Sequence, residues 1–286
     1  MIKSTKASVK KMSSKGVSTR KSYSGRRLVR KSSKKPASKK ATAGKLVPKS
    51  ASKSASGPGR VAKKTLAKSQ PKAASPWTAA EVYEAFSRFR KANPEPKGEL
   101  EHLNPYTLLV AVVLSAQATD AGVNKATRAL FAVADTPQKM LALGEERLRD
   151  YIKTIGLYRT KAKNVIALSE KLIADFDSQV PRTRAGIESL PGAGRKTANV
   201  VLNMAFGERT MAVDTHVFRV GNRTGLAPGK TPLDVELGLE RVIPSEFMLH
   251  AHHWLILHGR YTCLARSPRC EVCLINDLCR WPEKTV

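Results

Sequence analysis

The sequence predicts an all-α fold, and three observations lead to that prediction. Apolar residues recur at helical spacing through most of the chain after residue 76, as in helices with one buried face. Residues that typically cap or begin helices, such as Thr78 and the pair Thr231-Pro232, stand just before several of these patterns. No stretch alternates polar and apolar residues for long enough to predict a sheet.

The predicted helices follow one another with short breaks. Thr78 can cap the first helix, whose apolar face includes Val82, Phe86 and Phe89. The two prolines of residues 93–96 end it, because proline lacks the amide hydrogen that a helix interior needs. The remaining patterns predict helices over 105–117, 121–133, 136–143, 145–154, 160–176, 184–206 with a turn inside it, 217–222, 231–242 and 247–258.

Basic charge is concentrated in the first quarter of the chain. The 286 residues carry a formal net charge of +28, and 23 of the 51 Lys and Arg residues lie within 1–75, which holds no Asp or Glu. This segment is mainly Lys, Ser, Ala and Pro, so it has too little apolar surface to offset the chain entropy lost on folding. We expect a disordered tail that binds nucleic acid or acts as a spacer, with a transit peptide as the third alternative.

All four cysteines lie within the last 24 residues, which indicates a metal site and not a disulfide framework. Gaps of six, two and five residues separate Cys263, Cys270, Cys273 and Cys279. Four thiolates this close together can hold an iron–sulfur cluster or a structural zinc ion, and the spacing leaves both open. Four arginines flank the cysteines, and we expect them to bind phosphate, with simple solvation of the loop around the metal as the alternative: Arg260, Arg266, Arg269 and Arg280.

A glycine turn between Leu190 and Thr197 leads directly into a helical pattern. Gly192 and Gly194 allow backbone conformations and close approaches that a side chain would prevent. The first amides of the following helix have no partner within the helix, so they suit a phosphate oxygen. We interpret residues 184–206 as a helix–hairpin–helix unit, although glycine turns between helices are common in all-α proteins.

Two ionisable residues stand where covalent chemistry is feasible. Lys196 lies in the first turn of the predicted helix, where the helix dipole disfavours its protonated form. Shielding from water would lower its pKa below the ordinary value of roughly 10.4 and give an amine that can attack a sugar C1′. Asp214 can cap the helix over 217–222, and a carboxylate facing the lysine could assist its deprotonation. From the residues alone, a solvated phosphate contact and a simple helix cap are the alternatives.

Together these motifs resemble the endonuclease III family of helix–hairpin–helix DNA glycosylases. The resemblance covers residues 77–280 and rests on the hairpin, the run Val213 to Val217 and the cysteine spacing. It also includes residues 114–120, 153–158 and 253–263. It implies two helical domains, namely a six-helix barrel at 98–208 that contains the hairpin and an iron–sulfur domain made of 76–97 plus 209–286.

The resemblance also implies a role for each candidate site residue. Lys196 matches the Schiff-base nucleophile of the family, and Asp214 matches its essential carboxylate. The four cysteines match the ligands of a [4Fe–4S] cluster that shapes a DNA-binding loop. The tail 1–75 has no counterpart in compact family members, so its role does not follow. The implied DNA contacts are Gly192, Gly194 and Arg195 in the hairpin, with Gln117 and Leu157 filling the duplex where the damaged nucleotide has left.

The function implied is that of a bifunctional DNA glycosylase and AP lyase in base excision repair. Such an enzyme removes oxidised pyrimidines from double-stranded DNA and cuts the strand 3′ to the abasic site by β-elimination. One alternative is an adenine-mismatch glycosylase of the same superfamily, which usually has a non-nucleophilic residue where Lys196 stands. A non-catalytic DNA-binding protein is the other, and Lys196 together with Asp214 argues against it.

The expected partner is double-stranded DNA that contains damaged bases or abasic sites, bound by a monomer. No apolar run reaches the length of a membrane span, and the N-terminus lacks the apolar core of a secretory signal. We therefore expect no membrane partner and an intracellular, DNA-associated protein of the bacterial cytoplasm and its nucleoid. A nucleus or a mitochondrion is the alternative location.

Overall fold

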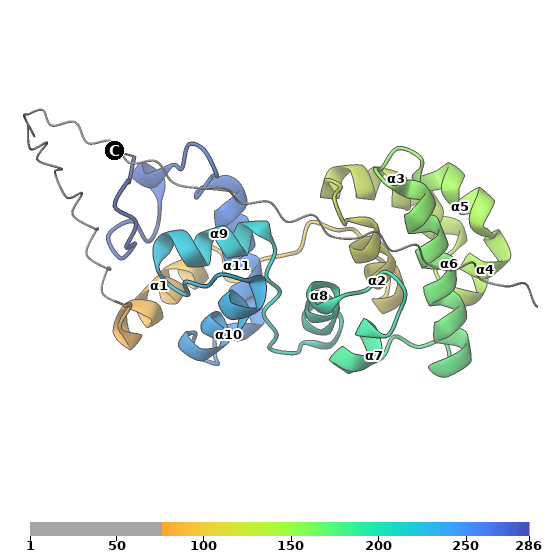
Figure 1. The fold of residues 1–286 in the computed structure, drawn as a ribbon, viewed down its shortest axis with the longest axis horizontal. Helices are drawn as coiled ribbons and strands as arrows, with labels where there is room; N and C mark the ends of the chain where they lie inside the picture. Colours follow the sequence, from red (N-terminus) through yellow and green to blue (C-terminus); the bar gives the residue numbers. More distant parts are fainter. Residues whose placement is uncertain (1–75, 286) are drawn as a thin grey trace, which may run out of the picture. The chain divides into compact units, whose positions relative to one another are not determined.

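The computed structural model describes residues 76–285, and the predicted disordered tail 1–75 lies outside the described residues. The described chain forms α-helices and one short 3-10 helix without any strand, which confirms the all-α prediction (Figure 1). Among these helices, none is both long enough and apolar enough to cross a membrane. In chain order the elements are α1 (Ala79–Ala92), α2 (Pro105–Leu114), α3 (Asp120–Val133), α4 (Pro137–Leu143), α5 (Glu145–Ile152), α6 (Tyr158–Asp175), α7 (Arg184–Glu188), α8 (Arg195–Phe206), α9 (Thr215–Thr224), α10 (Pro232–Val242), α11 (Met248–Tyr261) and η1 (Cys270–Val272).

Most helix ends lie within two residues of the predicted positions, and two differences have clear causes. α2 ends at Leu114 and not at residue 117, because Gln117 has a φ of 54°, which an α-helix cannot accommodate. Thr119 then begins the next helix by accepting a hydrogen bond from the amide of Gly122. α11 continues through Gly259 to Tyr261, and this glycine allows the helix to pack closely against His216, where a side chain would clash.

The apolar side chains form two cores. One core is built from α2 to α8 and includes Leu108, Leu130 and Leu168. The other is built from α1 and the helices after α8, and includes Phe86 and Trp254. α1 therefore packs with α9, α10 and α11, far from it in sequence, as Figure 1 shows. The two cores do not test the exact domain bounds 98–208 and 76–97 plus 209–286, which stay a prediction, and Ala212 belongs to the first core.

The segment 93–104 connects α1 to α2, and so connects the second core to the first. α8 lies against α2 and buries Ala198, Val201 and Leu202. The face of α8 that carries Lys196, Val200 and Met204 contributes to a pocket together with α11 and this connection. The fold thus places the first turn of α8 beside residues 97–100 of the connection and beside α11, which are far apart in the sequence.

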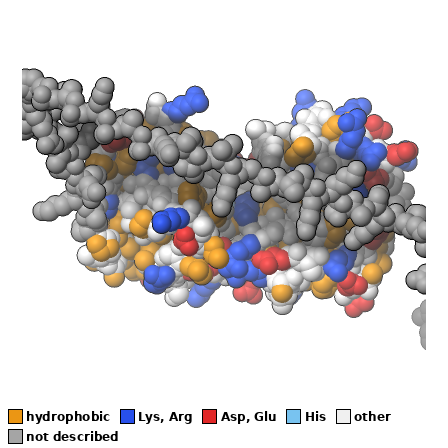
Figure 2. Space-filling view, in the orientation of Figure 1, with side chains coloured by type: hydrophobic (Ala, Val, Ile, Leu, Met, Phe, Trp, Pro, Cys, Tyr) orange, Lys and Arg blue, Asp and Glu red, His pale blue; other side chains and the backbone are white. Residues whose placement is uncertain are grey.

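The described surface is not dominated by one charge. Since the first 75 residues carry 23 basic and no acidic residues, the remainder has a net charge of only +5. Figure 2 shows Lys and Arg side chains interspersed with Asp and Glu on the described part of this face. Any affinity of this part of the chain for phosphate must therefore come from particular sites.

Candidate active site and metal centre

The hairpin forms as predicted, with α7 and α8 joined by residues 189–194. Gly192 has a φ of 80°, and a Cβ there would lie 2.9 Å from Nδ2 of Asn164 on α6. Gly194 is the N-cap of α8, and no side chain among the described residues caps this end of the helix. A Cβ at Gly194 would meet no atom within 4 Å. The amides at the start of α8 are therefore open to an anion, as a phosphate contact requires.

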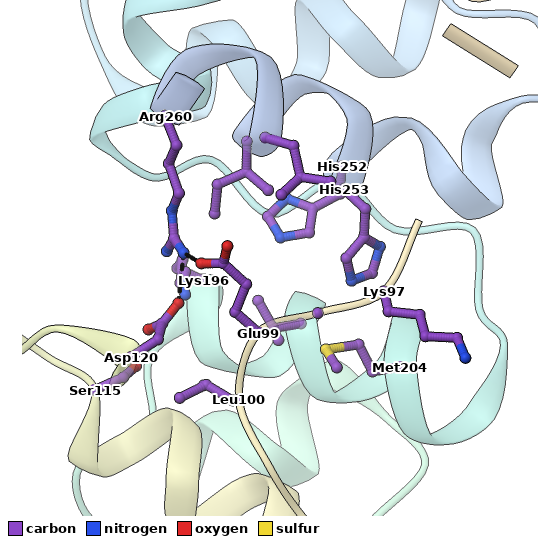
Figure 3. A pocket seen from close by; sticks show the side chains of 14 residues that line it. Lys97, Glu99, Leu100, Ser115, Asp120, Lys196, Met204, His252, His253 and Arg260 are labelled. Atoms are coloured by element: carbon purple, nitrogen blue, oxygen red, sulfur yellow. Dashed lines mark hydrogen bonds and ion pairs between the residues drawn. The ribbon is translucent and has the colours of Figure 1, made fainter. Parts of the chain in front are cut away.

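Lys196 is the second residue of α8 and lines a narrow cavity of about 50 Å³ (Figure 3). Burial lowers the pKa of Lys196. Two carboxylates, Asp214 and Asp120, raise this pKa, and the guanidinium of Arg260 lowers it. The sum is a pKa below the ordinary value of a lysine, which favours the free amine. The cavity is lined by Lys97, Gly98, Glu99, Leu100, Ser115, Asp120, Lys196, Val200, Met204, His252, His253, Ile256, Leu257 and Arg260.

Asp214 caps α9, as predicted, and its charge also acts on Lys196. Its Oδ1 accepts hydrogen bonds from the amides of His216 at 2.9 Å and Val217 at 2.8 Å. The cap fixes the carboxylate through one oxygen, and the negative charge raises the pKa of Lys196. Capping and proximity to the lysine therefore occur together in this side chain.

The four cysteines line one cavity of about 20 Å³, together with His258 and residues of the surrounding loop. They are free thiols, with Cys263 and Cys270 buried. Arg223 donates a hydrogen bond to Sγ of Cys263 at 3.6 Å and another to the carbonyl of Leu264, so a cation supports this end of the loop. Four convergent sulfur atoms around one cavity fit the donor set of an iron–sulfur cluster.

Gln117 and Leu157 share an unusual backbone conformation. Their φ angles are 54° and 59°, in the left-handed region that residues with side chains rarely adopt. Both side chains are exposed, and Leu157 keeps 60% of its surface accessible. A Cβ at Gly156 would lie 3.8 Å from the carbonyl oxygen of Gln117, so the two loops are neighbours. Two strained, exposed residues side by side on loops are typical of a contact surface.

The guanidinium of Arg195 forms an ion pair within the protein, and the DNA contact expected at Arg195 stays a prediction. Its guanidinium binds the buried carboxylate of Glu236 on α10 through Nε at 3.0 Å and Nη2 at 2.7 Å. Arg184 on α7 lies 4.0 Å from the same carboxylate. The side chain of Arg195 thus joins the hairpin to α10, and only its backbone amide remains suited to a phosphate.

Two of the four arginines near the cysteines also bind carboxylates of the protein. Arg260 binds Asp120 and Glu99, and Arg280 binds Glu81 on α1 at 2.6 Å. An arginine held by carboxylates has less positive charge to offer a phosphate. Acidic partners distant in sequence therefore bind the guanidinium groups of Arg260 and Arg280, and phosphate binding by these two residues stays a prediction.

Several pocket residues were not identified from the sequence. Asp120 lies inside the stretch 114–120, which could have drawn attention to it, whereas Arg260 was named only as one of the arginines near the cysteines. Glu99 and His252 had no such signal, because they follow no motif. His252 and His253 are buried and each has an Nδ1 without a hydrogen-bond partner among the described residues. Burial keeps the pKa of both imidazoles low, so both stay neutral at pH 7.

Comparison with known families gives two matches. Residues 110–245 match the family described as HhH-GPD superfamily base excision DNA repair protein. Residues 263–279, which contain all four cysteines, match the iron–sulfur binding domain of endonuclease III. The two matches cover the hairpin with Lys196 and the metal centre, respectively.

Individual relatives agree with these matches. The chain is 62% identical over 198 residues to the endonuclease III of Treponema pallidum, which covers 69% of this chain and 94% of the relative. It is 57% identical over 205 residues to the endonuclease III of Escherichia coli, with coverage of 72% and 97%. Among solved structures, a trapped endonuclease III–DNA covalent intermediate and a non-covalent endonuclease III–DNA complex each match with a TM-score of 0.67 and 46% identity. They cover 71% of this chain and 96% and 95% of their own chains.

Proposed function

The chain belongs to the endonuclease III family of the HhH-GPD superfamily of base excision DNA repair proteins, and we propose from this the residues that carry its reaction. It is a DNA glycosylase and AP lyase that binds DNA and carries a [4Fe–4S] cluster. We infer that its substrates are oxidised pyrimidines and abasic sites in double-stranded DNA. We also infer that it acts as a monomer in the bacterial cytoplasm, which agrees with the bacterial origin of the relatives named above.

The proposal rests on the burial of Lys196, on its lowered pKa and on the lack of an ion pair at its amine. It lines a cavity at the start of α8, and burial lowers its pKa. Asp214 and Asp120 act on it electrostatically, yet no carboxylate of the described residues lies within ion-pair distance of its Nζ. Partial desolvation and the lack of an ion pair both increase the fraction of free amine, which is the nucleophilic form of a lysine.

The reaction begins when the damaged nucleotide leaves the stack, at a cost of a few kcal/mol that is smaller for a weakened pair. Lys196 Nζ then forms a bond to C1′, and the bond between C1′ and the base breaks, so the base leaves with the bonding electrons and takes up a proton. Asp214 accepts a proton from Lys196 and stabilises positive charge on the sugar. Ring opening gives the Schiff base. Loss of a proton from C2′ and cleavage of the bond between C3′ and the phosphate oxygen then cut the strand. Water hydrolyses the Schiff base and releases Lys196.

The surface around the pocket provides the DNA contacts. The open amides at Gly194 and Arg195, with the close approach allowed by Gly192, suit a phosphate and read no sequence. Gln117 and Leu157 are exposed beside each other and suit the space left by the extruded nucleotide. For Arg195 we propose that the backbone makes the contact, since its side chain binds Glu236.

Cys263, Cys270, Cys273 and Cys279 are the proposed ligands of the cluster. When bound, it supplies four metal–sulfur bonds that hold residues 263–279 in one loop, and the proposed chemistry uses no electron from it. The loop is further held by the surrounding protein. Arg88 on α1 binds the carbonyl of Leu274 at 2.9 Å and the carboxylate of Asp277 at 2.6 Å.

The decisive experiment is borohydride trapping of the covalent intermediate on duplex DNA that contains thymine glycol. Lys196→Ala is expected to abolish trapping and leave DNA binding largely intact, because the substitution removes the amine and little of the DNA-binding surface. Lys97→Ala is the matched control, since this exposed lysine lines the same cavity and is expected to leave trapping unchanged. Undiminished trapping by Lys196→Ala would overturn the assignment.

A further inference from the structure

A charged network spans the cavity beside Lys196 (Figure 3). Nη1 of Arg260, near the end of α11, donates to Oδ2 of Asp120 at 2.6 Å. The same nitrogen binds Glu99 in the connection 93–104, and the hydroxyl of Tyr261 donates to Glu99 as well. Asp120 is the first residue of α3, and its side chain keeps 16% of its surface exposed. Arg260 therefore holds a largely buried carboxylate of one core from a helix of the other.

The charged and titratable groups around Lys196 come from several elements. Asp214 is committed to the cap of α9 through one oxygen, and Asp120 is bound by Arg260. Neither of these carboxylates forms an ion pair with Lys196, although both raise its pKa through their charge. The groups that line this cavity are Asp120 from α3, Arg260, His252 and His253 from α11, and Glu99 and Lys97 from the connection, and Asp214 from α9 acts on Lys196 through its charge.

We propose that Arg260 is a positioning residue that binds Asp120 and so withholds this carboxylate from Lys196, which leaves the lysine as a free amine. The inference rests on the proposed role of Lys196 as nucleophile. It adds that an ion pair between α11 and α3 controls how much of that nucleophile is available at neutral pH.

The physical reason is competition for one carboxylate. A largely buried aspartate needs a cation, because water cannot solvate its charge fully. Arg260 meets this need and keeps its own charge at every accessible pH. Without Arg260, the remaining cation of the cavity wall near Asp120 is Lys196, and an ammonium paired with a carboxylate holds its proton more tightly. Loss of Arg260 would thus remove a positive charge that lowers the pKa of Lys196. It would also free Asp120 to pair with Lys196, which raises the same pKa.

The test is the pH dependence of single-turnover borohydride trapping on a duplex with an abasic site, so that base excision does not enter the rate. Arg260→Gln is expected to move the acid limb of the profile upward by about one pH unit. Trapping below the limb then falls about tenfold and recovers at high pH. Asp120→Asn is expected to move the limb downward, and the double variant Arg260→Gln/Asp120→Asn to return it to or below the wild-type position.

Glu99→Gln is the matched control, because Glu99 binds the same arginine but, unlike Asp120, is not among the groups whose charge shifts the pKa of Lys196. Its profile is expected to match the wild type. Cluster absorbance and binding to a duplex with a tetrahydrofuran abasic analogue show that each variant is folded. If Arg260→Gln does not fold, Asp120→Asn alone decides, since an unchanged or upward limb contradicts the proposal.

Three results would overturn the proposal. Arg260→Gln could lower the rate by the same factor at every pH, the double variant could keep the upward shift, or Glu99→Gln could shift the limb equally. Each would assign the network a purely structural role. These outcomes leave the role of Lys196 standing, which Lys196→Ala tests separately.

Discussion

At the scale of single residues, the surroundings decide what Lys196 and Asp214 can do. The same lysine on an open helix face would be a protonated surface residue with a pKa near its ordinary value. Here burial in a narrow cavity lowers this pKa, and the nearby carboxylates are engaged elsewhere. Asp214 combines two functions, because the oxygen that caps α9 also fixes the position of its charge.

Asp214→Asn separates the two functions of this side chain. Asparagine caps helices about as well as aspartate, so the free energy of unfolding is expected to change by less than about 0.5 kcal/mol. Loss of the negative charge is expected to slow single-turnover base release by about 100-fold or more. Urea denaturation and single-turnover kinetics measure the two effects.

Asp214→Ala provides the comparison, since it removes both the charge and the cap. Its free energy of unfolding is expected to be about 1 kcal/mol lower than that of Asp214→Asn. Should Asp214→Asn retain wild-type kinetics while Asp214→Ala loses stability, the carboxylate would be a cap and nothing more.

Gln117 and Leu157 show a different residue-scale effect. A left-handed φ costs a residue with a Cβ about 1–2 kcal/mol. Glycine would avoid this cost but would provide no side chain for the proposed contact with the duplex. The protein thus keeps a strained backbone at both positions, and the exposed side chain of Leu157 gains no folding stability through burial.

At the scale of elements, the position of the hairpin depends on α10. Glu236 is buried and receives the guanidinium of Arg195 from α8, with Arg184 of α7 beside it. A buried carboxylate that loses its partner is strongly destabilising, whereas a neutral replacement of the carboxylate leaves Arg195 free to be solvated. The two partners of this pair are therefore unequal in their effect on stability.

Arg195→Met is expected to lower the free energy of unfolding by about 3 kcal/mol, because it leaves the carboxylate of Glu236 without its bidentate partner. Glu236→Gln is expected to cost less, and the double variant is expected to be more stable than Arg195→Met alone. Urea denaturation of the four proteins measures this cycle. If Arg195→Met instead kept full stability and weakened DNA binding, the guanidinium of Arg195 would contact DNA and its ion pair with Glu236 would not stabilise the fold.

At the scale of the whole molecule, α11 links the site to acid stability. His252 and His253 lie in this helix, both buried beside the cavity. Burial lowers the pKa of His253 to about 4 and that of His252 well below its ordinary value of 6.5. In the unfolded chain these imidazoles take up protons at higher pH than in the folded protein. Stability is therefore complete above about pH 6.5 and is lost as the pH falls toward 4.

The expected contribution of His253 is a loss of about 3 kcal/mol in the free energy of unfolding between pH 6.5 and pH 4. His253→Gln is expected to flatten this part of the stability profile, since glutamine does not titrate. Chemical denaturation at pH 7, 5.5 and 4.5 measures the slope. Equal slopes in the wild type and the variant would show that the folded protein accepts the proton without cost.

The sequence by itself determined the helices and the motifs. Helical periodicity and capping residues are local, so residues such as Thr78 and Thr231 marked helix starts correctly. The cysteine spacing and the hairpin are also local, and the resemblance that they carry identified the family. Lys196 was visible for the same reason, because its position in the first turn of α8 follows from the glycine turn before it.

Only the tertiary structure decided which charges meet. Arg195 and Glu236 are 41 positions apart, Arg260 and Asp120 are 140 apart, and Arg260 and Glu99 are 161 apart. A local pattern cannot specify such pairs, because packing brings the side chains together only after both cores have formed. The same holds for the left-handed backbone at Gln117, which the apolar run before it predicted as helix. Local propensity determined the helices, whereas the long-range pairing of buried charges determined the electrostatic environment of Lys196.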